Sequence, residues 1–430
     1  MRKVIRVIST VLFLAFFMMP FLMCSQIKTG AEQTVLYYPL LKNKVIGIVA
    51  NQASVVDSVN VVDVLVRQGF NISRIFSPEH GFRMSGEAGQ IIGNSIDSAT
   101  AIQVVSLYGN RKKPVPDDLK SLDLILFDIQ DVGVRFYTYI STLTYVMEAC
   151  AESGVPLIVL DRPNPNGFYI DGPVLEKEFT SFVGMHQVPV VYGMTIGEYA
   201  RMVNGEGWLK GGKKCDLRVI PMKNYTHRTR CILPAKPSPN LPNPTAVGLY
   251  PSLCFFEGTN ISVGRGTPFP FQVYGYPGLN SCKFSFIPQS MPGAVLRPPL
   301  EGLKCCGEDL RNYYTEHHGE SGKIVLAWTA SSRPRVSCAI EAASTLIATQ
   351  HCPISSCSSL ARWRRSCSCS WINCWASCRF CASMRKFVSS INLRAVISTA
   401  NSRQRRQPNQ ARAVDNSSRV IGSSSSCKCS

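Results

Sequence analysis

"LDLILFDIQDVGVRFYTYISTLTYVMEACAESGVPLIVLD", residues 122–161, is the stretch that decides the fold. Its apolar runs at 122–129 and 155–161 are interpreted as strands, and segment 138–154 between them as a helix. Both runs are apolar at successive positions, which is typical of strands that are buried on both faces. Such strands, alternating with helices, predict a mostly parallel sheet with helices covering its faces.

The same alternation precedes this stretch. The runs at 45–50, 72–77 and 102–109 predict three more strands, and 55–69 predicts a helix that ends at a glycine. The fold class is therefore α/β, with a Rossmann-like sheet domain over residues 34–165. The first strand is followed by "ANQASVVD" rather than G-x-G-x-x-G, and the chain contains no G-x-x-x-x-G-K-[ST]. Because both nucleotide motifs are missing, we predict no cofactor.

Residues 166–313 differ in composition from the preceding segment. Proline and glycine become more frequent, the apolar runs shorten, and long polar loops such as 234–244 and 256–275 intervene. We interpret this part as a second, smaller α/β domain. The active site is predicted in the cleft between the two domains.

The charge and the cysteines of the chain are concentrated near its C-terminus. The 430 residues carry a net charge of +18, but most of the excess lies after residue 320, where 16 Lys and Arg face two acids. The body of the chain is nearly neutral, so its charge indicates no nucleic-acid partner. Residues 314–430 are rich in Cys, Ser and Arg and lack hydrophobic periodicity. They are interpreted as an aberrant, disordered tail that begins where the native reading frame is lost, between about residues 313 and 340.

Residues 1–24 are predicted to be a secretory signal. Three basic residues precede an apolar run at 7–23, which is short for a membrane span. Cys24 closes the run and is a candidate for a lipid anchor, although Met23 stands where lipoprotein signals have a small residue. We therefore expect an exported protein, periplasmic or on the cell surface.

Polar residues follow the predicted strands at their carboxyl ends, where open parallel sheets bind ligands. The stretch "SPEHG" (77–81) places Glu79 and His80 directly after a strand. An acid held against Phe76 and Pro78 is partly desolvated, which suits it to protonating a leaving group. The alternative is a solvated loop glutamate.

Three other stretches carry candidate ligand contacts. Segment 128–139 contains Asp128, Asp131, Arg135, Tyr137 and Tyr139, a set suited either to core packing or to gripping a carboxylate and stacking on a sugar. Segment 256–267 contains Glu257, Asn260 and Arg265, and the loop "PSPN" (237–240) carries Asn240. No G-x-S-x-G or H-E-x-x-H occurs, and the histidines show no metal-ligand spacing, so no metal is predicted.

These stretches together resemble a known family. "SPEHGFR", "SGEAG", "SLYG", "DIQDVGVRFYTYISTL", "LDRPNPNG", "GMTIGE", "PSPNLPN" and "FEGTNISVGRGTPFPFQVYGYP" occur in the order found in bacterial exo-β-N-acetylmuramidases, the NamZ-type glycoside hydrolases. The resemblance covers about residues 40–313. It implies a Rossmann-like domain, a smaller α/β domain, and release of N-acetylmuramic acid from the non-reducing ends of peptidoglycan fragments during cell-wall turnover or recycling. The expected partners are thus muro-saccharides such as MurNAc–GlcNAc.

The resemblance also places the catalytic glutamate, at Glu79, but it does not settle the mechanism. Our hypothesis is that Glu79 protonates the glycosidic oxygen while His80 and Arg83 orient it. A second carboxylate is expected at Asp131, or else at Glu198 or Glu257. The lactyl carboxylate of muramic acid is expected to meet Arg135 or Arg265, and the sugar ring to stack on Tyr137 or Tyr139, with Asn240 and Asn260 as further substrate contacts.

Two other functions are compatible with the same residues. In the first, the chain is a cell-wall sugar-binding protein in which Glu79 only accepts hydrogen bonds. In the second, it is a metal-assisted hydrolase built on His80, Asp128 and Asp131. The first predicts binding without turnover, and the second predicts loss of activity on chelation.

Overall fold

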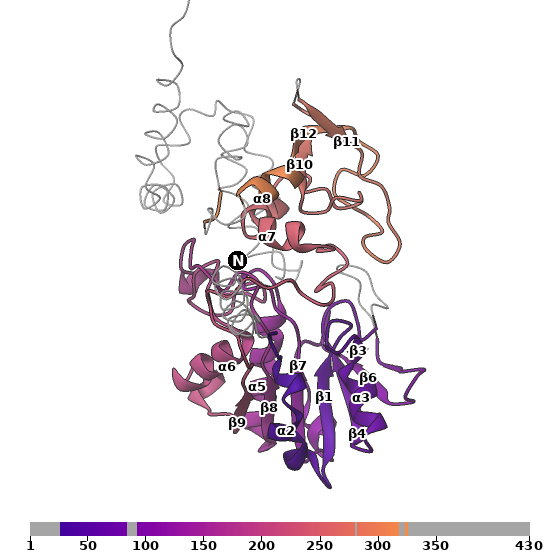
Figure 1. The fold of residues 1–430 in the computed structure, drawn as a ribbon, viewed down its shortest axis with the longest axis vertical. Coiled ribbons are helices and arrows are strands. Elements are labelled where there is room, and N and C mark those ends of the chain that lie inside the picture. Colours follow the sequence, from indigo (N-terminus) through magenta and orange to yellow (C-terminus); the bar gives the residue numbers. More distant parts are fainter. Residues whose placement is uncertain (1–25, 84–92, 280–281, 318–322, 326–430) are drawn as a thin grey trace, which may run out of the picture. The chain divides into compact units, whose positions relative to one another are not determined.

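In a computed structural model of the chain, the alternating apolar runs form a seven-stranded sheet in the order β5-β6-β4-β1-β7-β8-β9 (Figure 1). The structure describes residues 26–83, 93–279, 282–317 and 323–325. All neighbouring strands are parallel except β5 and β6, which are antiparallel. The strands are β1 (Val45–Ala50), β4 (Asn71–Ser77), β5 (Ser95–Ile96), β6 (Gln103–Ser106), β7 (Leu124–Asp128), β8 (Leu157–Leu160) and β9 (Leu217–Ile220).

The strand order explains where a ligand site is expected. From β6 to β9, the parallel strands follow the doubly wound order, in which the chain reverses direction across the sheet between β1 and β7. Crevices form at the carboxyl ends of strands that flank this switch point. The predicted α/β class with a mostly parallel sheet is confirmed.

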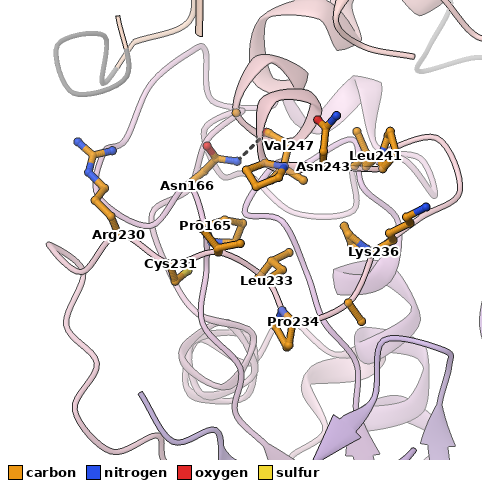
Figure 2. A pocket seen from close by; sticks show the side chains of 16 residues that line it. Pro165, Asn166, Arg230, Cys231, Leu233, Pro234, Lys236, Leu241, Asn243 and Val247 are labelled. Carbon is orange, nitrogen blue, oxygen red and sulfur yellow. Dashed lines mark hydrogen bonds between the residues drawn. The ribbon is translucent and has the colours of Figure 1, made fainter. Parts of the chain in front are cut away.

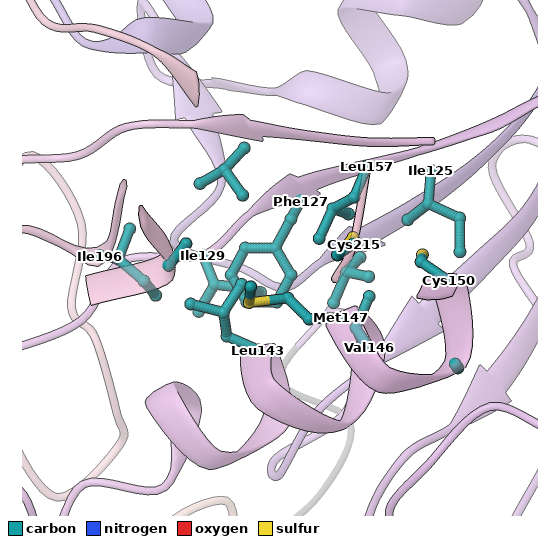
Figure 3. Packing of buried hydrophobic residues seen from close by; sticks show 14 of the residues in the cluster. Ile125, Phe127, Ile129, Leu143, Val146, Met147, Cys150, Leu157, Ile196 and Cys215 are labelled. Carbon is teal, nitrogen blue, oxygen red and sulfur yellow. The ribbon is translucent and has the colours of Figure 1, made fainter. Parts of the chain in front are cut away.

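Helices cover both faces of the sheet. On one face, α2 (Thr34–Leu41) and α3 (Val61–Arg67) pack on Ile46, Ile48 and Leu126. On the other face, α5 (Tyr139–Ser153) and α6 (Ile196–Gly205) pack on strand residues such as Phe127, and α4 (Pro116–Leu119) adds Leu119. Figure 3 shows Leu143, Val146 and Met147 of α5 directed at the strands. Consecutive residues of one strand thus enter two different cores, which is why the runs are continuously apolar.

The predicted helix at 55–69 is wrong in its first half. Val55–Val56 (β2) and Val59–Asn60 (β3) form a small antiparallel hairpin, and α3 begins only at Val61. Asp57 and Ser58 have φ values of 46° and 68°, which close a two-residue turn whose geometry matches the strands. The helix then starts at the Asn60 cap, whose side chain accepts a hydrogen bond from the Val62 amide.

The sheet domain extends beyond residue 165, where its end was predicted. Strand β9 pairs with β8 from Leu157↔Leu217 to Leu160↔Ile220, and α6 packs beside it. Asp161 receives the Gly197 amide and the Thr195 hydroxyl, both at 2.8 Å, and so ties the end of β8 to the start of α6. The boundary at 165/166 therefore needs correction, because the last strand comes from residues that were assigned to the second domain.

A second core surrounds α7 (Pro244–Leu253) and the 3₁₀ helix η5 (Cys254–Gly258). Val132 and Val134, which follow β7, are buried in the same core. A three-stranded antiparallel sheet in the order β10-β12-β11 adjoins it, and Cys282 and Cys306 form a disulfide there. Its strands are β10 (Val273–Tyr276), β11 (Phe284–Phe286) and β12 (Cys305–Asp309).

The ordered structure continues past residue 313, where the second domain was predicted to end. Helix α8 spans Arg311–His317. Further on, the Ile324 amide donates to Asp171 at 2.6 Å and the Val325 amide donates to Ser252 at 2.9 Å. The predicted tail thus begins later than residue 314.

Several predictions lie outside the described residues. These are the signal and Cys24 at residues 1–24, the "SGEAG" motif at 85–89, and the tail from residue 326 onward. Among the residues that the structure describes, no helix is both long and apolar enough to cross a membrane.

Candidate active site

Glu79 lies in a tight turn directly after β4, at the carboxyl edge of the sheet. The next two residues, His80 and Gly81, have φ values of 72° and 75°, and the Gly81 amide donates to the Pro78 carbonyl at 3.1 Å. A left-handed histidine is uncommon, so this turn is held by its surroundings. The Glu79 side chain is half-buried, and the Thr138 hydroxyl donates to its Oε2 at 3.4 Å.

The charge of Glu79 acts on groups from four other segments. They are Tyr108 after β6, Tyr139 in α5, Tyr250 in α7 and Arg265 in the loop before β10. Two of these segments belong to the sheet domain and two to the second core. Groups from both parts of the chain are thus within reach of the Glu79 charge, and the cleft itself stays a prediction.

The loop at 237–240 is fastened against this edge of the sheet. The Pro237 carbonyl accepts hydrogen bonds from the Tyr137 hydroxyl at 2.7 Å, Gln52 at 3.3 Å and the Tyr139 hydroxyl at 3.5 Å. The next residue, Ser238, has its Oγ 3.3 Å from Nε2 of His80. The loop is thus bonded to residues that follow β1, β4 and β7, and His80 is the residue after β4 that contacts it.

Arg265 and Glu257 form an ion pair in the second part of the chain. Arg265 Nη2 lies 2.6 Å from Glu257 Oε1, and Nε donates to the same oxygen at 2.8 Å. Burial lowers the pKa of Arg265, but the Glu257 carboxylate outweighs it and the pKa is raised overall. Among the three predicted partner acids, Glu257 is the one whose arginine is also affected by the charge of Glu79.

Asp131 is placed differently from the prediction. Its side chain is buried, and Oδ2 accepts the Gly133 amide at 2.6 Å and the Tyr192 hydroxyl. Burial raises the pKa of Asp131 to about 6, and these two hydrogen bonds oppose the rise. Its carboxylate stabilises the turn after β7 rather than a position beside Glu79.

Glu198 is also a structural residue. It is the third residue of α6 and completes a capping box with Thr195, whose amide donates to it at 2.8 Å. Its other neighbour is His227, with Nε2 at 2.9 Å, and both side chains are largely exposed. A carboxylate used in this way is a helix cap, and its prediction as a catalytic partner is not supported by its position.

Arg135 was predicted, as the alternative to Arg265, to meet the lactyl carboxylate, and its position does not favour this role. The side chain is buried, and its Nη1 donates to the carbonyls of Pro173 and Val188. Burial lowers the pKa of Arg135 to about 10. The guanidinium joins two chain segments from within the core, so Arg265 remains as the candidate for the lactyl group.

The side chains of Arg83 and Tyr139 are likewise held by contacts with other residues of the protein. Arg83 forms ion pairs with Asp63 at 2.8 Å and Asp97 at 2.6 Å. Tyr139 is 2% exposed and accepts a hydrogen bond from Asn51, so its ring has no free face for a sugar. Tyr137 is half-buried against Tyr139, at a ring-centroid distance of 4.7 Å.

The two asparagines differ in exposure. Asn240 is 2% exposed and its Nδ2 donates to the Ala294 carbonyl at 3.1 Å, so it stabilises the loop. Asn260 is exposed and stays a predicted substrate contact. Three residues that were given no role, Tyr108, Thr138 and Ser238, contact Glu79 or His80. Tyr108 lies in the "SLYG" motif, Ser238 in "PSPN" and Thr138 in "DIQDVGVRFYTYISTL", so the sequence motifs contained all three.

A pocket of about 410 Å³ borders the Pro237 loop (Figure 2). Prolines and aliphatic residues from 230–237 and 241–248 line it, together with Pro165 and Asn166. The side-chain Nδ2 of Asn166 donates hydrogen bonds to the Val132 carbonyl at 2.9 Å and to the Val247 carbonyl at 3.3 Å. Glu79 is not among the lining residues, so this pocket is separate from the catalytic candidate.

No group of three or more His, Cys, Asp or Glu side chains within the described ranges is arranged to hold a metal ion.

Comparison with known proteins identifies relatives over most of the chain. Residues 46–245 match the family described as exo-beta-N-acetylmuramidase NamZ, N-terminal, and residues 248–349 match its C-terminal counterpart. The second match continues past residue 313, so the resemblance extends further than expected. The chain is 44% identical over 285 residues to the peptidoglycan beta-N-acetylmuramidase NamZ of Bacillus subtilis (strain 168), covering 63% of this chain and 67% of that protein.

Two solved structures share the fold. Both are DUF1343 family proteins from Bacteroides fragilis NCTC 9343. The first is 43% identical with a TM-score of 0.67, covering 79% of this chain and 95% of the other. The second is 28% identical with a TM-score of 0.59, covering 74% and 89%.

Proposed function

The chain belongs to the exo-β-N-acetylmuramidase NamZ family, and we propose that it releases N-acetylmuramic acid from peptidoglycan fragments with Glu79 as its general acid. The enzyme is a glycosidase. One observation carries the choice of Glu79: this half-buried carboxyl lies at the carboxyl edge of the sheet, where groups from both parts of the chain face it. Such an edge is the usual ligand position in an open parallel sheet.

In the proposed reaction, the Glu79 carboxyl gives its proton to the glycosidic oxygen as the bond from that oxygen to the anomeric carbon breaks. Water supplies the new oxygen at the anomeric carbon. Glu257 is the preferred second carboxylate, because Arg265 holds it at 2.6 Å and also faces Glu79. Arg265 is the preferred partner of the lactyl carboxylate, because Arg135 is buried against backbone carbonyls.

We also propose that the enzyme acts outside the cytoplasm, in cell-wall turnover or recycling. The basic and apolar segment at 1–23 supports export. The Cys282–Cys306 disulfide supports it independently, because disulfides persist mainly in oxidising compartments.

The test of the function compares a disaccharide with the trisaccharide made by adding one GlcNAc to its non-reducing end. MurNAc–GlcNAc is expected to yield free MurNAc, whereas GlcNAc–MurNAc–GlcNAc is expected to stay intact. Products are separated and identified by mass spectrometry. Cleavage of the second saccharide would show an endo mode or a glucosaminidase, and binding of the first without turnover would show a sugar-binding protein.

A further inference from the structure

Tyr108 lies beside Glu79 because of the register of two parallel strands. Strands β4 and β6 pair Phe76 with Val105 and Ser77 with Ser106, and the Leu107 amide donates to the Ser77 carbonyl at 2.8 Å. Two residues further along each chain stand Glu79 and Tyr108. Neighbouring parallel strands thus bring a carboxyl and a phenol together at the edge where the substrate is expected.

The two side chains are in contact. The Tyr108 hydroxyl is hydrogen-bonded to the Glu79 carboxyl, and the phenol is half-buried. Burial and the Glu79 charge raise the pKa of Tyr108 well above its usual value, whereas the charge of Arg265 opposes the rise. The phenol therefore keeps its proton at neutral pH and acts as a donor toward the carboxylate.

Resting on the proposed role of Glu79, we propose that Tyr108 is a positioning residue that fixes the Glu79 carboxyl and stabilises it after proton transfer. A general acid becomes negatively charged as it gives up its proton. A fixed hydroxyl donor is worth more to the resulting carboxylate than to the neutral acid, so it lowers the barrier of the chemical step. Ground-state binding of the sugar does not depend on this hydrogen bond, so its loss affects kcat rather than KM.

The other groups around Glu79 remain when the phenol is removed. The Thr138 hydroxyl contacts Oε2, and the imidazole of the adjacent His80 is directed at Ser238. The remaining charged and titratable neighbours are Tyr139, Tyr250 and Arg265. A change in kcat on removal of the Tyr108 hydroxyl is thus attributable to that hydroxyl.

The experiment compares Tyr108→Phe with Tyr145→Phe, a control in α5 whose ring stacks on Phe182 at 6.1 Å. Both changes keep the ring and remove one hydroxyl. With MurNAc–GlcNAc as substrate, Y108F is expected to lower kcat about 10- to 100-fold, with KM within about twofold of the wild type. Y145F is expected to match the wild type.

A double-mutant cycle distinguishes positioning from general damage. Because Tyr108 acts through Glu79, Y108F is expected to have little further effect in an E79Q background. Equal activity of Y108F and Y145F would overturn the inference, as would a raised KM with unchanged kcat or an additive effect in the cycle. Full activity of E79Q alone would instead overturn the proposed general acid.

Discussion

The ion pair between Asp128 and Arg162 yields a prediction about the strand ends that support the site. Asp128 closes β7 and Arg162 follows β8, and both side chains are 0% exposed. Arg162 Nε donates to Oδ1 at 2.5 Å and Nη2 to Oδ2 at 2.7 Å, and Nη2 also donates to the Val55 carbonyl at 3.0 Å. The pair therefore joins β7, the end of β8 and the hairpin before α3.

The change Asp128→Asn keeps the shape of the side chain and removes its charge. Arg162 is then left as a buried cation without its carboxylate, which costs about 3–5 kcal/mol of the free energy of unfolding. The matched control is Glu152→Gln, which removes the carboxylate from a surface pair with Lys113 at 2.8 Å, exposed by 35% and 27%. An exposed pair contributes only about 0–1 kcal/mol.

The assay is urea unfolding at pH 7, followed by circular dichroism and evaluated by linear extrapolation. We expect D128N to lose several times as much stability as E152Q. A loss for D128N within about 1 kcal/mol of the control would refute the reasoning, because it would mean that water or a rearranged side chain satisfies Arg162.

Three further predictions test other parts of the account. Arg265→Leu is expected to weaken competitive inhibition by free MurNAc about 10- to 100-fold and inhibition by GlcNAc far less, because only MurNAc carries the lactyl carboxylate. Equal losses for the two sugars would exclude a contact between Arg265 and that carboxylate. Burial raises the pKa of Asp131 from 3.8 to about 6, so its contribution to stability is complete below pH 4 and is lost as pH rises through 6. Relative to the wild type, Asp131→Asn should therefore gain about 2 kcal/mol between pH 4.5 and 7 in unfolding experiments, and a constant difference would contradict this. Cys306→Ala opens a loop of 24 residues, so we expect a loss of about 3 kcal/mol, and a reductant should lower the stability of the wild type but not of the variant.

The sheet was predictable from the sequence because its strands are buried on both faces. Strand β1 has the predicted bounds, 45–50, and β4 differs by one residue. The hairpin at 55–60 was missed because its four strand residues lie next to the apolar residues of α3, so the run resembles one longer helix. Only the positive φ values of Asp57 and Ser58 reveal the turn.

The position of Glu79 was also predictable, since a polar residue after a parallel strand must lie at the ligand edge. The roles of its neighbours were not. Arg135 and Arg265 are equivalent as residue types, yet one is bound to buried carbonyls and the other pairs with Glu257 within reach of the Glu79 charge. That difference depends on contacts between segments far apart in the chain, which local patterns do not contain. The same limit explains why Tyr108 was given no role, although its motif was recognised.

The most direct test of the account is the turnover of MurNAc–GlcNAc by the wild type and by Glu79→Gln, measured side by side with the release of free MurNAc as the readout. Glutamine keeps the size of the side chain and removes the transferable proton, which is worth about 10²- to 10⁴-fold in general acid catalysis. We predict release by the wild type and a loss of at least about 100-fold in E79Q, with the fold retained. A folded E79Q enzyme that keeps most of its turnover would contradict the central claim.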